Sequence, residues 1–437
     1  MSASSHFTVI IVGGGQAGLS VSYCLNQLGI DHLVLEKNKI AHSWRSKRWD
    51  SFCLVTPNWQ CTLPGYPYPG GDLDGFMPRD KIVQYIETYA RSFQSPVKEG
   101  VAVMRVAQAP KLERQDRFQV ETTLGDFTAN HVVIATGGYH QPQIPRMAAQ
   151  LPQPILQLHS SEYKNPESLP DGAVMVVGTG QSGCQIAEDL HLAGRQVHLC
   201  VGSAPRSPRR YRGKDVVDWL DQMGYYDMPI HEHPQKESVR TKTNHYVTGR
   251  GGGREIDLRQ FALEGMQLYG RLNSIQGSRL GFQDNLKQNL DHADAVAESI
   301  KQTIDKYIAQ NQIEAPTEPP YEPAWQPQTV PLEADALAAN ITTIIWSTGY
   351  RMDFSWIDVP VFNGSGYPAH ERGVAAVDGL YFVGLPWLYT WGSARFSGIA
   401  QDARYLVDCI ALRHKMHYSR AVHIPDEAAL GGYIMGI

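Results

Sequence analysis

Two glycine-rich turns of the same form, 165 residues apart, are the feature that most restricts the fold of this 437-residue chain. The first turn, Gly13–Gly18, follows the apolar run Phe7–Val12, and the second, Gly178–Gly183, follows Ala173–Val177. Residues at helical spacing come directly after each turn. A buried strand, a G-x-G-x-x-G turn and a helix form the core of a dinucleotide-binding unit. The repeat therefore predicts an α/β protein with two Rossmann-like dinucleotide-binding domains.

The first turn has the context that a nucleotide site requires. The next apolar run ends in Glu36, 18 residues after Gly18, close to the usual distance of about 20 for an acid that accepts ribose hydroxyls. Gly15 lets the backbone approach a pyrophosphate, which the helix N-terminus attracts. The alternative is a tight turn without a ligand. The residues expected at this site are Gly13, Gly15, Gln16, Ala17, Gly18, Glu36 and Lys37.

The second turn differs at the position of the acid. Val201, Gly202 and Ser203 stand there, and three arginines follow within ten residues. Guanidinium groups suit a 2′-phosphate, so NADPH is predicted here, with a solvated basic loop or a nucleic-acid patch as the alternative. The residues expected at this site are Gly178, Gly180, Gln181, Ser182, Gly183, Ser203, Arg206, Arg209 and Arg210.

Two nucleotide sites in one chain indicate a redox pair. Two nicotinamides have no chemistry with each other, whereas NADPH can pass a hydride to FAD, which is therefore predicted at the first site. The six cysteines never form a C-x-x-C motif. Reduction of a protein disulfide is disfavoured for that reason, and dioxygen is the remaining oxidant.

The order of the motifs predicts that the NADPH domain is inserted into the FAD domain. The expected parts are residues 1–160 and 331–437 for FAD and residues 161–330 for NADPH. A polar, helical insert without an obvious sheet is expected over about 212–330, and the proline-rich stretch Ala315–Pro331 is expected to be a linker.

Composition excludes several other classes. Hydrophobic residues at 42% and charged residues at 19% are ordinary for a globular protein, and a net charge of −5 argues against nucleic acid or an anionic membrane as partner. No signal segment and no run of about 18 apolar residues is found, so a cytoplasmic protein is expected. No histidine or cysteine cluster suggests a metal site. The expected partners are dioxygen and a small-molecule substrate, with a homodimer left open.

Taken together, these motifs resemble the class B flavin monooxygenases, which include the flavin-containing monooxygenases and the plant auxin-forming enzymes. In detail the chain is similar to a bacterial group of flavin-dependent oxidoreductases often encoded beside a nitrilase. The resemblance is weakest over about Met223–Pro331. It implies that Trp44 and Arg45 also line the FAD, and that the chain crosses between domains at two places. The residues implied at the crossings and at the flavin-contacting loop are Ala135, Thr136, Gly137, Thr348, Gly349 and Gly384.

The family fingerprint F-x-G-x-x-x-H-x-x-x-[Y/F/W] is only half present. His159 and Tyr163 match it, but Gln153 and Ile155 stand in place of phenylalanine and glycine, and Lys164 weakens a Baeyer–Villiger assignment. His159 is either catalytic or a hinge histidine bonded to backbone. The candidate catalytic residues are His159, Asn58 and Arg395, and the aromatic loop Trp387–Trp391 and Asn244-His245-Tyr246 are candidates near substrate and nicotinamide.

The resemblance implies a monooxygenase. NADPH reduces FAD, dioxygen forms a C4a-(hydro)peroxyflavin, and a small N- or S-containing nucleophile or a carbonyl compound is oxygenated. The first alternative is an NADPH-dependent FAD oxidoreductase without a stable oxygen intermediate, which the broken fingerprint favours. The second, from another class, is a flavin-binding redox sensor or partner protein, which exposed aromatics over Trp387–Trp391 would favour.

Overall fold

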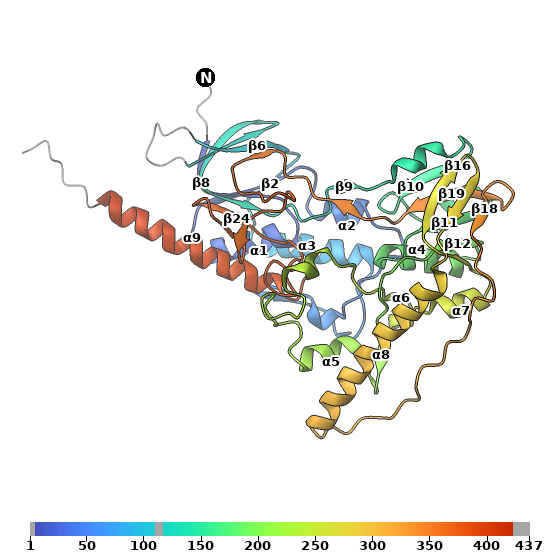
Figure 1. Cartoon of the computed structure of the whole chain (residues 1–437). Helices are drawn as coiled ribbons and strands as arrows, with labels where there is room; N and C mark the ends of the chain where they lie inside the picture. The colour runs from blue at the N-terminus through green and yellow to red at the C-terminus, as the bar shows by residue number, and fades with distance from the viewer. Residues whose placement is uncertain (1–4, 110–116, 423–437) are drawn as a thin grey trace, which may run out of the picture.

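The computed structural model describes residues 5–109 and 117–422 and forms two lobes, each built on its own sheet (Figure 1). The first sheet has the order β21-β6-β7-β8-β1-β2-β5, with β24 added beside β8 and the hairpin β22-β23 beside β24. Strands β1, β2, β5, β8 and β24 run parallel where they pair, as the buried apolar runs predict. The bounds are β1 Ser5–Val12, β2 His32–Glu36, β5 Val97–Glu99, β6 Val103–Gln108, β7 Phe118–Thr122, β8 Gly125–Ile134, β21 Ile357–Asp358, β22 His370–Glu371, β23 Val374–Ala375 and β24 Leu380–Phe382.

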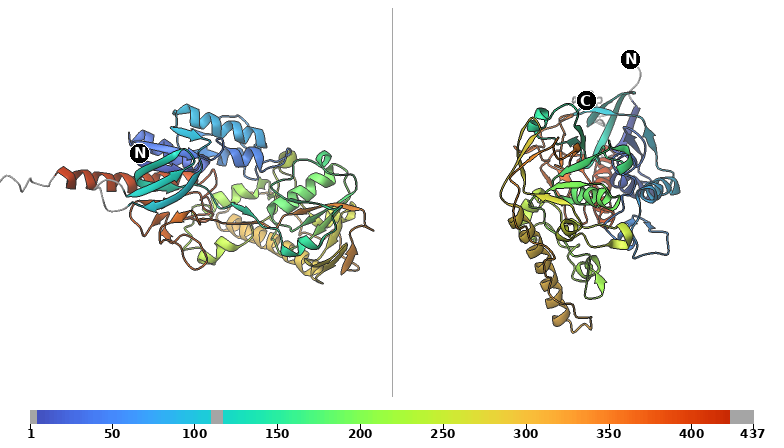
Figure 2. Two further views of the ribbon diagram at one scale, coloured as in Figure 1. Left: turned by 90° about the horizontal axis from the view of Figure 1, so that it is seen from above. Right: turned by 90° about the vertical axis from the view of Figure 1, so that its right-hand side faces the viewer.

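The second sheet repeats this plan with five parallel strands in the order β10-β19-β11-β12-β15. Viewed from above, the lobes lie side by side (Figure 2). The bounds are β10 Leu156–His159, β11 Ala173–Val177, β12 Val197–Cys200, β15 Gln267–Tyr269 and β19 Ile341–Trp346. The prediction of an α/β fold with two dinucleotide-binding lobes is confirmed.

The predicted domain boundaries at 160 and 330 need correction. Strands β10 and β19 pair in the second sheet, so residues 156–159 and 341–346 belong to that lobe. The two crossing segments themselves pair as a short antiparallel ladder of β9 (Gln141–Pro142) with β20 (Tyr350–Arg351). The chain therefore passes between lobes just after the predicted crossing motifs, and both passages run next to each other.

Helices cover the sheets and connect the lobes. Helix α1 packs against α9 and β2, and α4 packs against β11 and β12. In the part of the chain that the structure describes, no helix is both long and apolar enough to cross a membrane. The helices are α1 Gln16–Gln27, α2 His42–Ser46, α3 Arg79–Ser92, α4 Gln181–Leu192, α5 Val216–Gln222, α6 Arg250–Gly253, α7 Leu258–Leu263, α8 Leu286–Gln310 and α9 Ile399–Val422, with 3-10 turns at η1 Asn58–Gln60, η2 Arg146–Gln150, η3 Pro166–Ser168 and η4 Lys236–Thr241.

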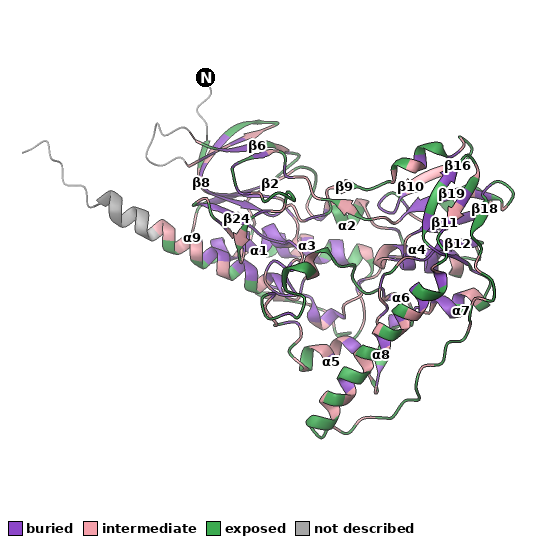
Figure 3. Ribbon diagram, in the orientation of Figure 1, coloured by how far each residue is buried: buried purple, intermediate pink, exposed green. Residues whose placement is uncertain are grey.

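The insert contains strands, contrary to the prediction of a helical segment without a sheet. Strands β16 (Leu272–Gln276) and β17 (Arg279–Phe282) form a hairpin to which β18 (Glu333–Asp335) adds. Their apolar residues alternate over only four or five positions, which is too short a pattern to predict strands. Packing against the second sheet stabilises these strands in the fold. Three two-residue ladders are β3 Thr62–Leu63 with β4 Tyr66–Pro67, β13 Arg210–Tyr211 with β14 Lys214–Asp215, and the crossing pair β9–β20. Helix α8 is exposed along much of its length (Figure 3), and Ala315–Pro331 returns beside it without regular structure.

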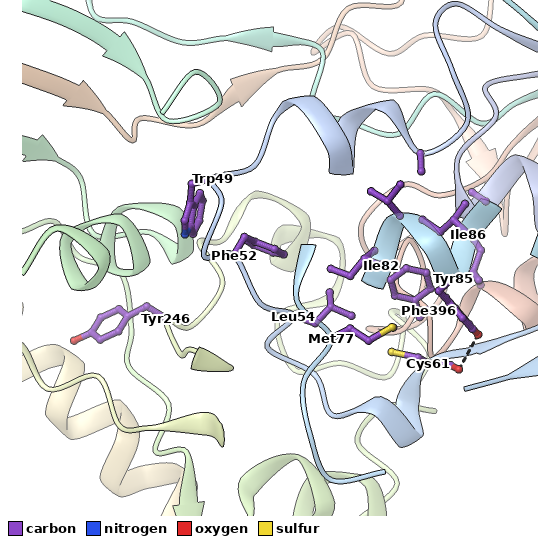
Figure 4. Close-up of a cluster of buried hydrophobic side chains, with 14 of the residues drawn as sticks. Trp49, Phe52, Leu54, Cys61, Met77, Ile82, Tyr85, Ile86, Tyr246 and Phe396 are labelled. Carbon is purple, nitrogen blue, oxygen red and sulfur yellow. Dashed lines mark hydrogen bonds between the residues drawn. The ribbon is translucent and has the colours of Figure 1, made fainter. Parts of the chain in front are cut away.

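One continuous apolar core joins the two lobes. It runs from Tyr85 and Phe396 in the first lobe through Trp49 and Phe52 to Tyr246 of the insert (Figure 4). The Tyr85 hydroxyl donates to the carbonyl oxygen of Cys61 (2.9 Å), which fixes the loop that follows η1. Because the core is shared, residues of the insert are held against the first lobe, where the flavin is expected.

A buried histidine in β8 makes stability depend on pH. His131 is 1% exposed, and burial lowers its pKa to about 3. Below pH 6.5 the unfolded chain binds a proton that the folded chain does not, so the free energy of unfolding falls by about 1.4 kcal/mol per pH unit as the pH drops from 6.5. We expect His131→Gln to remove this contribution between pH 6.5 and 5, measured by urea unfolding. An unchanged slope in the variant would contradict the assignment.

Candidate functional site

The first glycine turn lies between the carboxyl end of β1 and the N-terminus of α1. Gly13 adopts a φ of +113°, and a Cβ there would lie 2.7 Å from the Ala135 carbonyl oxygen. A Cβ on Gly18 would collide with the carbonyl oxygen of Gly13. A Cβ on Gly15 meets nothing within 4 Å, and no side chain caps α1. The turn therefore keeps an open space in front of unpaired helix N–H groups, which fits a pyrophosphate.

Glu36 lies where the sequence predicts an acceptor for ribose. Its Oε2 accepts from the Gly14 N–H (2.7 Å) and its Oε1 from the Asn38 N–H (2.8 Å). These bonds fix the carboxylate beside the turn and leave lone pairs for hydroxyl groups. Across the turn, the hydroxyl of Thr136 is buried without a partner, as expected where a bound group supplies one.

The other predicted flavin contacts divide into two groups. The Trp44 Nε1–H donates to Gln16 Oε1, and the Gln16 side chain donates to the Ala394 carbonyl, each at 3.3 Å. A Cβ on Gly384 would lie 2.7 Å from Ala17 Cβ, so the loop after β24 approaches the start of α1. In contrast, Arg45 pairs with Glu87 at 2.5 Å and Lys37 is exposed. Arg45 is thus directed to α3 instead of to the turn.

The second turn is built like the first. Gly178 has a φ of +104°, and its Cβ would lie 2.7 Å from the Ser347 carbonyl oxygen. A Cβ on Gly183 would collide with the Gly178 carbonyl oxygen, and α4 also lacks a side-chain cap. Gln181 Nε2 donates to the Val247 carbonyl (2.7 Å), so the insert lies against this turn. Ser182 is half-buried and Ser203 is exposed after β12.

Two of the three arginines predicted for the 2′-phosphate are structural. Arg206 is 3% exposed and pairs with Asp294 (3.0 Å) and Asp257 (3.5 Å). Arg209 is 2% exposed and pairs with Asp215. Carboxylates already occupy both guanidinium groups, so neither is available to a phosphate. Arg210 is exposed and donates to the Gly252 carbonyl (3.1 Å), which leaves it as the candidate from this set.

Substitution of the buried, paired Arg209 and of the exposed Arg210 should change the stability of the protein to different extents. Arg209→Met should lower the free energy of unfolding by about 3–5 kcal/mol, because it leaves the Asp215 carboxylate buried without its partner. Arg210→Met should change it by less than about 0.5 kcal/mol, because the side chain is exposed. Denaturant unfolding of the two variants checks this. If Arg209→Met lowers the free energy of unfolding as little as Arg210→Met does, Arg209 does not have the structural role assigned to it.

His159 lies where the chain crosses between the lobes, and both of its ring nitrogens are hydrogen-bonded. Its ring is fully buried, Nε2–H donates to the Gly349 carbonyl (3.0 Å), and Nδ1 accepts from the Ser161 N–H (3.2 Å). Burial lowers its pKa, so the ring stays neutral. Both nitrogens are used within the crossing segments. These contacts favour the backbone-bonded alternative over the predicted catalytic role.

The rest of the fingerprint also serves the joint between lobes. The Tyr163 hydroxyl donates to Asp189 Oδ2 (2.7 Å), and the Ser51 hydroxyl donates to Oδ1 of the same carboxylate (2.6 Å). Arg250 of the insert pairs with Asp189 as well. At the second crossing the Thr348 hydroxyl donates to the Gln143 carbonyl. One carboxylate of α4 therefore links the first lobe, the crossing and the insert, and no sequence motif marks Asp189 for this role.

Arg395 marks where the loop after β24 meets the insert. Its guanidinium stacks 3.9 Å above the Trp391 ring and donates to Asn244 Oδ1 (3.3 Å). Trp391 in turn packs against Tyr226, with ring centroids 4.3 Å apart. Among the described residues no carboxylate forms an ion pair with the half-buried Arg395, so an aromatic ring and an amide oxygen hold its guanidinium instead. Trp387 is 5% exposed, so the aromatic loop is packed and not displayed on the surface.

Asn58 and Gln60 lie in the 3-10 turn η1. The Asn58 side chain donates to the Asp72 carbonyl (2.8 Å), while its Oδ1 has no partner. Gln60 is 3% exposed, and both polar atoms of its side chain are buried without a partner. Sequence reasoning missed Gln60, because a single glutamine in a loop carries no signal. It lines a cavity of about 290 Å³ together with residues of α5 and the start of α9.

Comparison with known proteins agrees with this geometry. The family model described as pyridine nucleotide-disulphide oxidoreductase matches residues 10–259. The chain belongs to this family. A CzcO-like oxidoreductase of Geobacillus kaustophilus is 33% identical over 407 residues, which cover 92% of this chain and 97% of that protein.

Flavin monooxygenases are among the similar proteins. The indole-3-pyruvate monooxygenase YUCCA6 of Arabidopsis thaliana is 31% identical over 199 residues, 45% of this chain and 48% of that protein. A flavin-containing monooxygenase structure from Stenotrophomonas maltophilia has a TM-score of 0.63 at 18% identity, covering 94% of this chain and 99% of that chain. The predicted resemblance to class B flavin monooxygenases is thereby confirmed. The chain is an oxidoreductase, as predicted, and the predicted pair of FAD and NADPH agrees with this family and with the flavin enzymes whose fold the chain shares.

Proposed function

We propose that the protein is an NADPH- and oxygen-dependent flavin monooxygenase that acts on a small molecule. The observation that carries the proposal is the pair of matching open turns, one with Glu36 and one without an acid, joined by a packed interface. Bound FAD would supply the redox chemistry, taking a hydride from NADPH and reacting with dioxygen. The protein then needs no metal and no acid–base pair of its own.

Different residues would bind the two cofactors. The turn at Gly13–Gly18 would hold the FAD pyrophosphate and Glu36 its ribose. The turn at Gly178–Gly183 would hold NADPH, with Ser203 and Arg210 on the 2′-phosphate, because both are exposed after β12. The shared core and the Asp189 contacts support a fixed distance between the two sites. Fixed positions matter because hydride transfer requires close, aligned reactants.

The packed interface has a second role in this proposal. Trp391, Tyr226 and Trp387 close the region where the loop after β24 meets the insert. Apolar surfaces exclude water, and exclusion of water protects reactive species from side reactions. Arg395 adds a positive charge there, held by Asn244 and by the Trp391 ring. We assign Arg395 to this interface as a residue that can favour negative charge on a bound molecule.

The test is rapid mixing. The FAD-loaded protein is reduced with NADPH without oxygen and then mixed with oxygenated buffer, while flavin absorbance and hydrogen peroxide are recorded. Slow return of the oxidised spectrum with little early peroxide supports a monooxygenase. Immediate reoxidation with one peroxide per NADPH supports the alternative, an oxidoreductase without a stable oxygen intermediate, which the departures at Gln153 and Ile155 favour. Failure of NADPH to reduce the flavin would overturn both.

A further inference from the structure

A buried carboxyl group lies next to the aromatic loop. Asp402 stands in the first turn of α9 and is 2% exposed. One of its oxygens, Oδ2, is buried without a hydrogen-bond partner. Taking a carboxylate out of water is costly, and burial raises the pKa of Asp402 to about 6 despite a hydrogen bond from Ser393. A neutral side chain would avoid this cost, so the carboxyl suggests a role other than packing.

Ser393 connects Asp402 to the backbone of the aromatic loop. The Ser393 Oγ accepts from the Tyr389 N–H (3.0 Å) and from the Thr390 N–H (3.1 Å). Both acceptor sites of the hydroxyl are then occupied, and its single proton is donated to Asp402. An ionised carboxylate accepts a hydrogen bond about twice as strong as a neutral group does. The charge on Asp402 therefore determines how firmly this turn of the loop is held.

The aromatic loop also forms the interface with the insert. The Ile230 N–H donates to the Tyr389 carbonyl (2.7 Å), and the Trp391 ring packs on Tyr226 with centroids 4.3 Å apart. Tyr389 thus bonds to Ser393 through its N–H and to the insert through its carbonyl. A chain of contacts runs from the carboxyl of α9 to the interface that excludes water in the proposed function.

We propose that Asp402 is a positioning residue for the flavin reaction, which holds the aromatic loop against the insert through Ser393. Its role in the reaction rests on the proposed monooxygenase function, whereas its hold on the loop does not. With Asp402 ionised, the loop is fixed and the interface excludes water. With Asp402 protonated, the bond from Ser393 weakens, the loop loosens and water enters.

Arg372 is the charged group that faces Asp402 from outside α9. It stands in the turn between β22 and β23, and its guanidinium lies between the rings of Tyr389 and Tyr405, 4.0 and 4.1 Å from their centroids. Of the charged side chains that the structure describes, Arg372 is the one that acts on Asp402, and it lowers the pKa less than burial raises it. A guanidinium stays charged between pH 5 and 8, so a titration near the loop in this range belongs to Asp402 or to a histidine.

Three histidines near the loop have to be distinguished from Asp402. His233 of the insert packs edge-on against Trp387, with ring centroids 5.0 Å apart, and His245 lies in the same part of the insert. Burial lowers the pKa of both, and it lowers that of His370 in β22 to about 4. Trp391 is therefore the better reporter, because its ring contacts are with a tyrosine and an arginine.

Fluorine NMR of the FAD-loaded protein labelled with 5-fluorotryptophan tests the hold on the loop. Tryptophan-to-phenylalanine variants assign the signals of Trp391 and Trp346. In the wild type the Trp391 signal should shift between pH 5 and 8 with a midpoint near pH 6. In Asp402→Asn it should stay at the low-pH position throughout. Trp346, fully buried in β19, should not shift in either protein.

Two further variants distinguish Asp402 from its neighbours. His233→Gln/His245→Gln should keep the titration of Trp391, and its loss there would assign the titration to a histidine and overturn the proposal. Ser393→Ala should abolish the titration, because the bond between Asp402 and the loop is removed, and it decides the matter if Asp402→Asn does not fold. A wild-type Trp391 signal that does not move, or a titration that persists in Ser393→Ala, would also overturn the proposal.

Reoxidation of the reduced flavin tests the role in the reaction. After reduction with NADPH, the Asp402→Asn protein should be reoxidised by oxygen at least threefold faster than the wild type at pH 8, and at the same rate at pH 5. Equal rates at pH 8 would overturn the role in the reaction. Failure of NADPH to reduce the wild-type flavin would instead refute the proposed function, while a titration of Trp391 that depends on Asp402 would still support the hold on the loop.

Discussion

Replacing Gly15 with alanine should yield a folded protein that no longer retains FAD. Gly15 has a φ of −83°, which alanine adopts freely, and its added Cβ would meet no protein atom within 4 Å. The methyl group would instead occupy the space in which a pyrophosphate approaches the backbone. We expect FAD to bind at least about 100-fold more weakly, about 2.7 kcal/mol, while the melting temperature of the apoprotein stays unchanged. Flavin content after purification and titration of apoprotein with FAD measure this.

Gly18→Ala is the matched comparison. Its Cβ would collide with the carbonyl oxygen of Gly13, so the turn itself must shift. We expect this variant to lose stability in the apoprotein as well as FAD. If Gly15→Ala retains FAD at the wild-type level, the pyrophosphate does not lie over this turn, and the first site has been placed wrongly.

The contrast between these two glycines shows what could be predicted from the sequence. Each turn is a local feature in which a short strand, a glycine spacing and a helix are adjacent in the chain. The backbone geometry of Gly13 and Gly178, with φ of +113° and +104°, follows from that spacing. Glu36 could be assigned because it ends the strand next to β1, so its distance from the turn is set by the strand pairing.

Residues whose roles depend on distant partners could not be predicted in the same way. Arg206 is indistinguishable in sequence from a phosphate-binding arginine, and only the fold brings Asp294 of α8 to it. The sequence around His159 suggests a catalytic candidate. Only the fold brings the Gly349 carbonyl, 190 residues further along the chain, to its Nε2. Gln60 has no sequence signal, because its significance is the absence of a partner in a buried place. The strands of the insert were missed because each is too short to show a period without its neighbours.

Replacing Gly180 with alanine should impair the NADPH site and leave FAD binding intact. Gly180 has a φ of −63°, and an added Cβ would lie 3.6 Å from Thr243 Cγ2, an ordinary contact. The protein should therefore fold and keep FAD, because the first turn is untouched. The methyl group would stand in front of the uncapped N-terminus of α4, where the second pyrophosphate is expected. We expect flavin reduction by NADPH, at a fixed concentration below saturation, to slow by at least about 100-fold, about 2.7 kcal/mol in transition-state stabilisation.

Dithionite reduction provides the control, because it bypasses the nucleotide site. Gly180→Ala should be reduced by dithionite like the wild type, which shows that the bound flavin is intact. Gly183→Ala, whose Cβ would collide with the Gly178 carbonyl oxygen, should in addition lower the melting temperature. Wild-type rates with NADPH in Gly180→Ala would mean that the hydride donor binds elsewhere. The two variants would then not show two independent nucleotide sites. The first turn alone would bind a nucleotide, and the second turn would be a structural copy without a ligand.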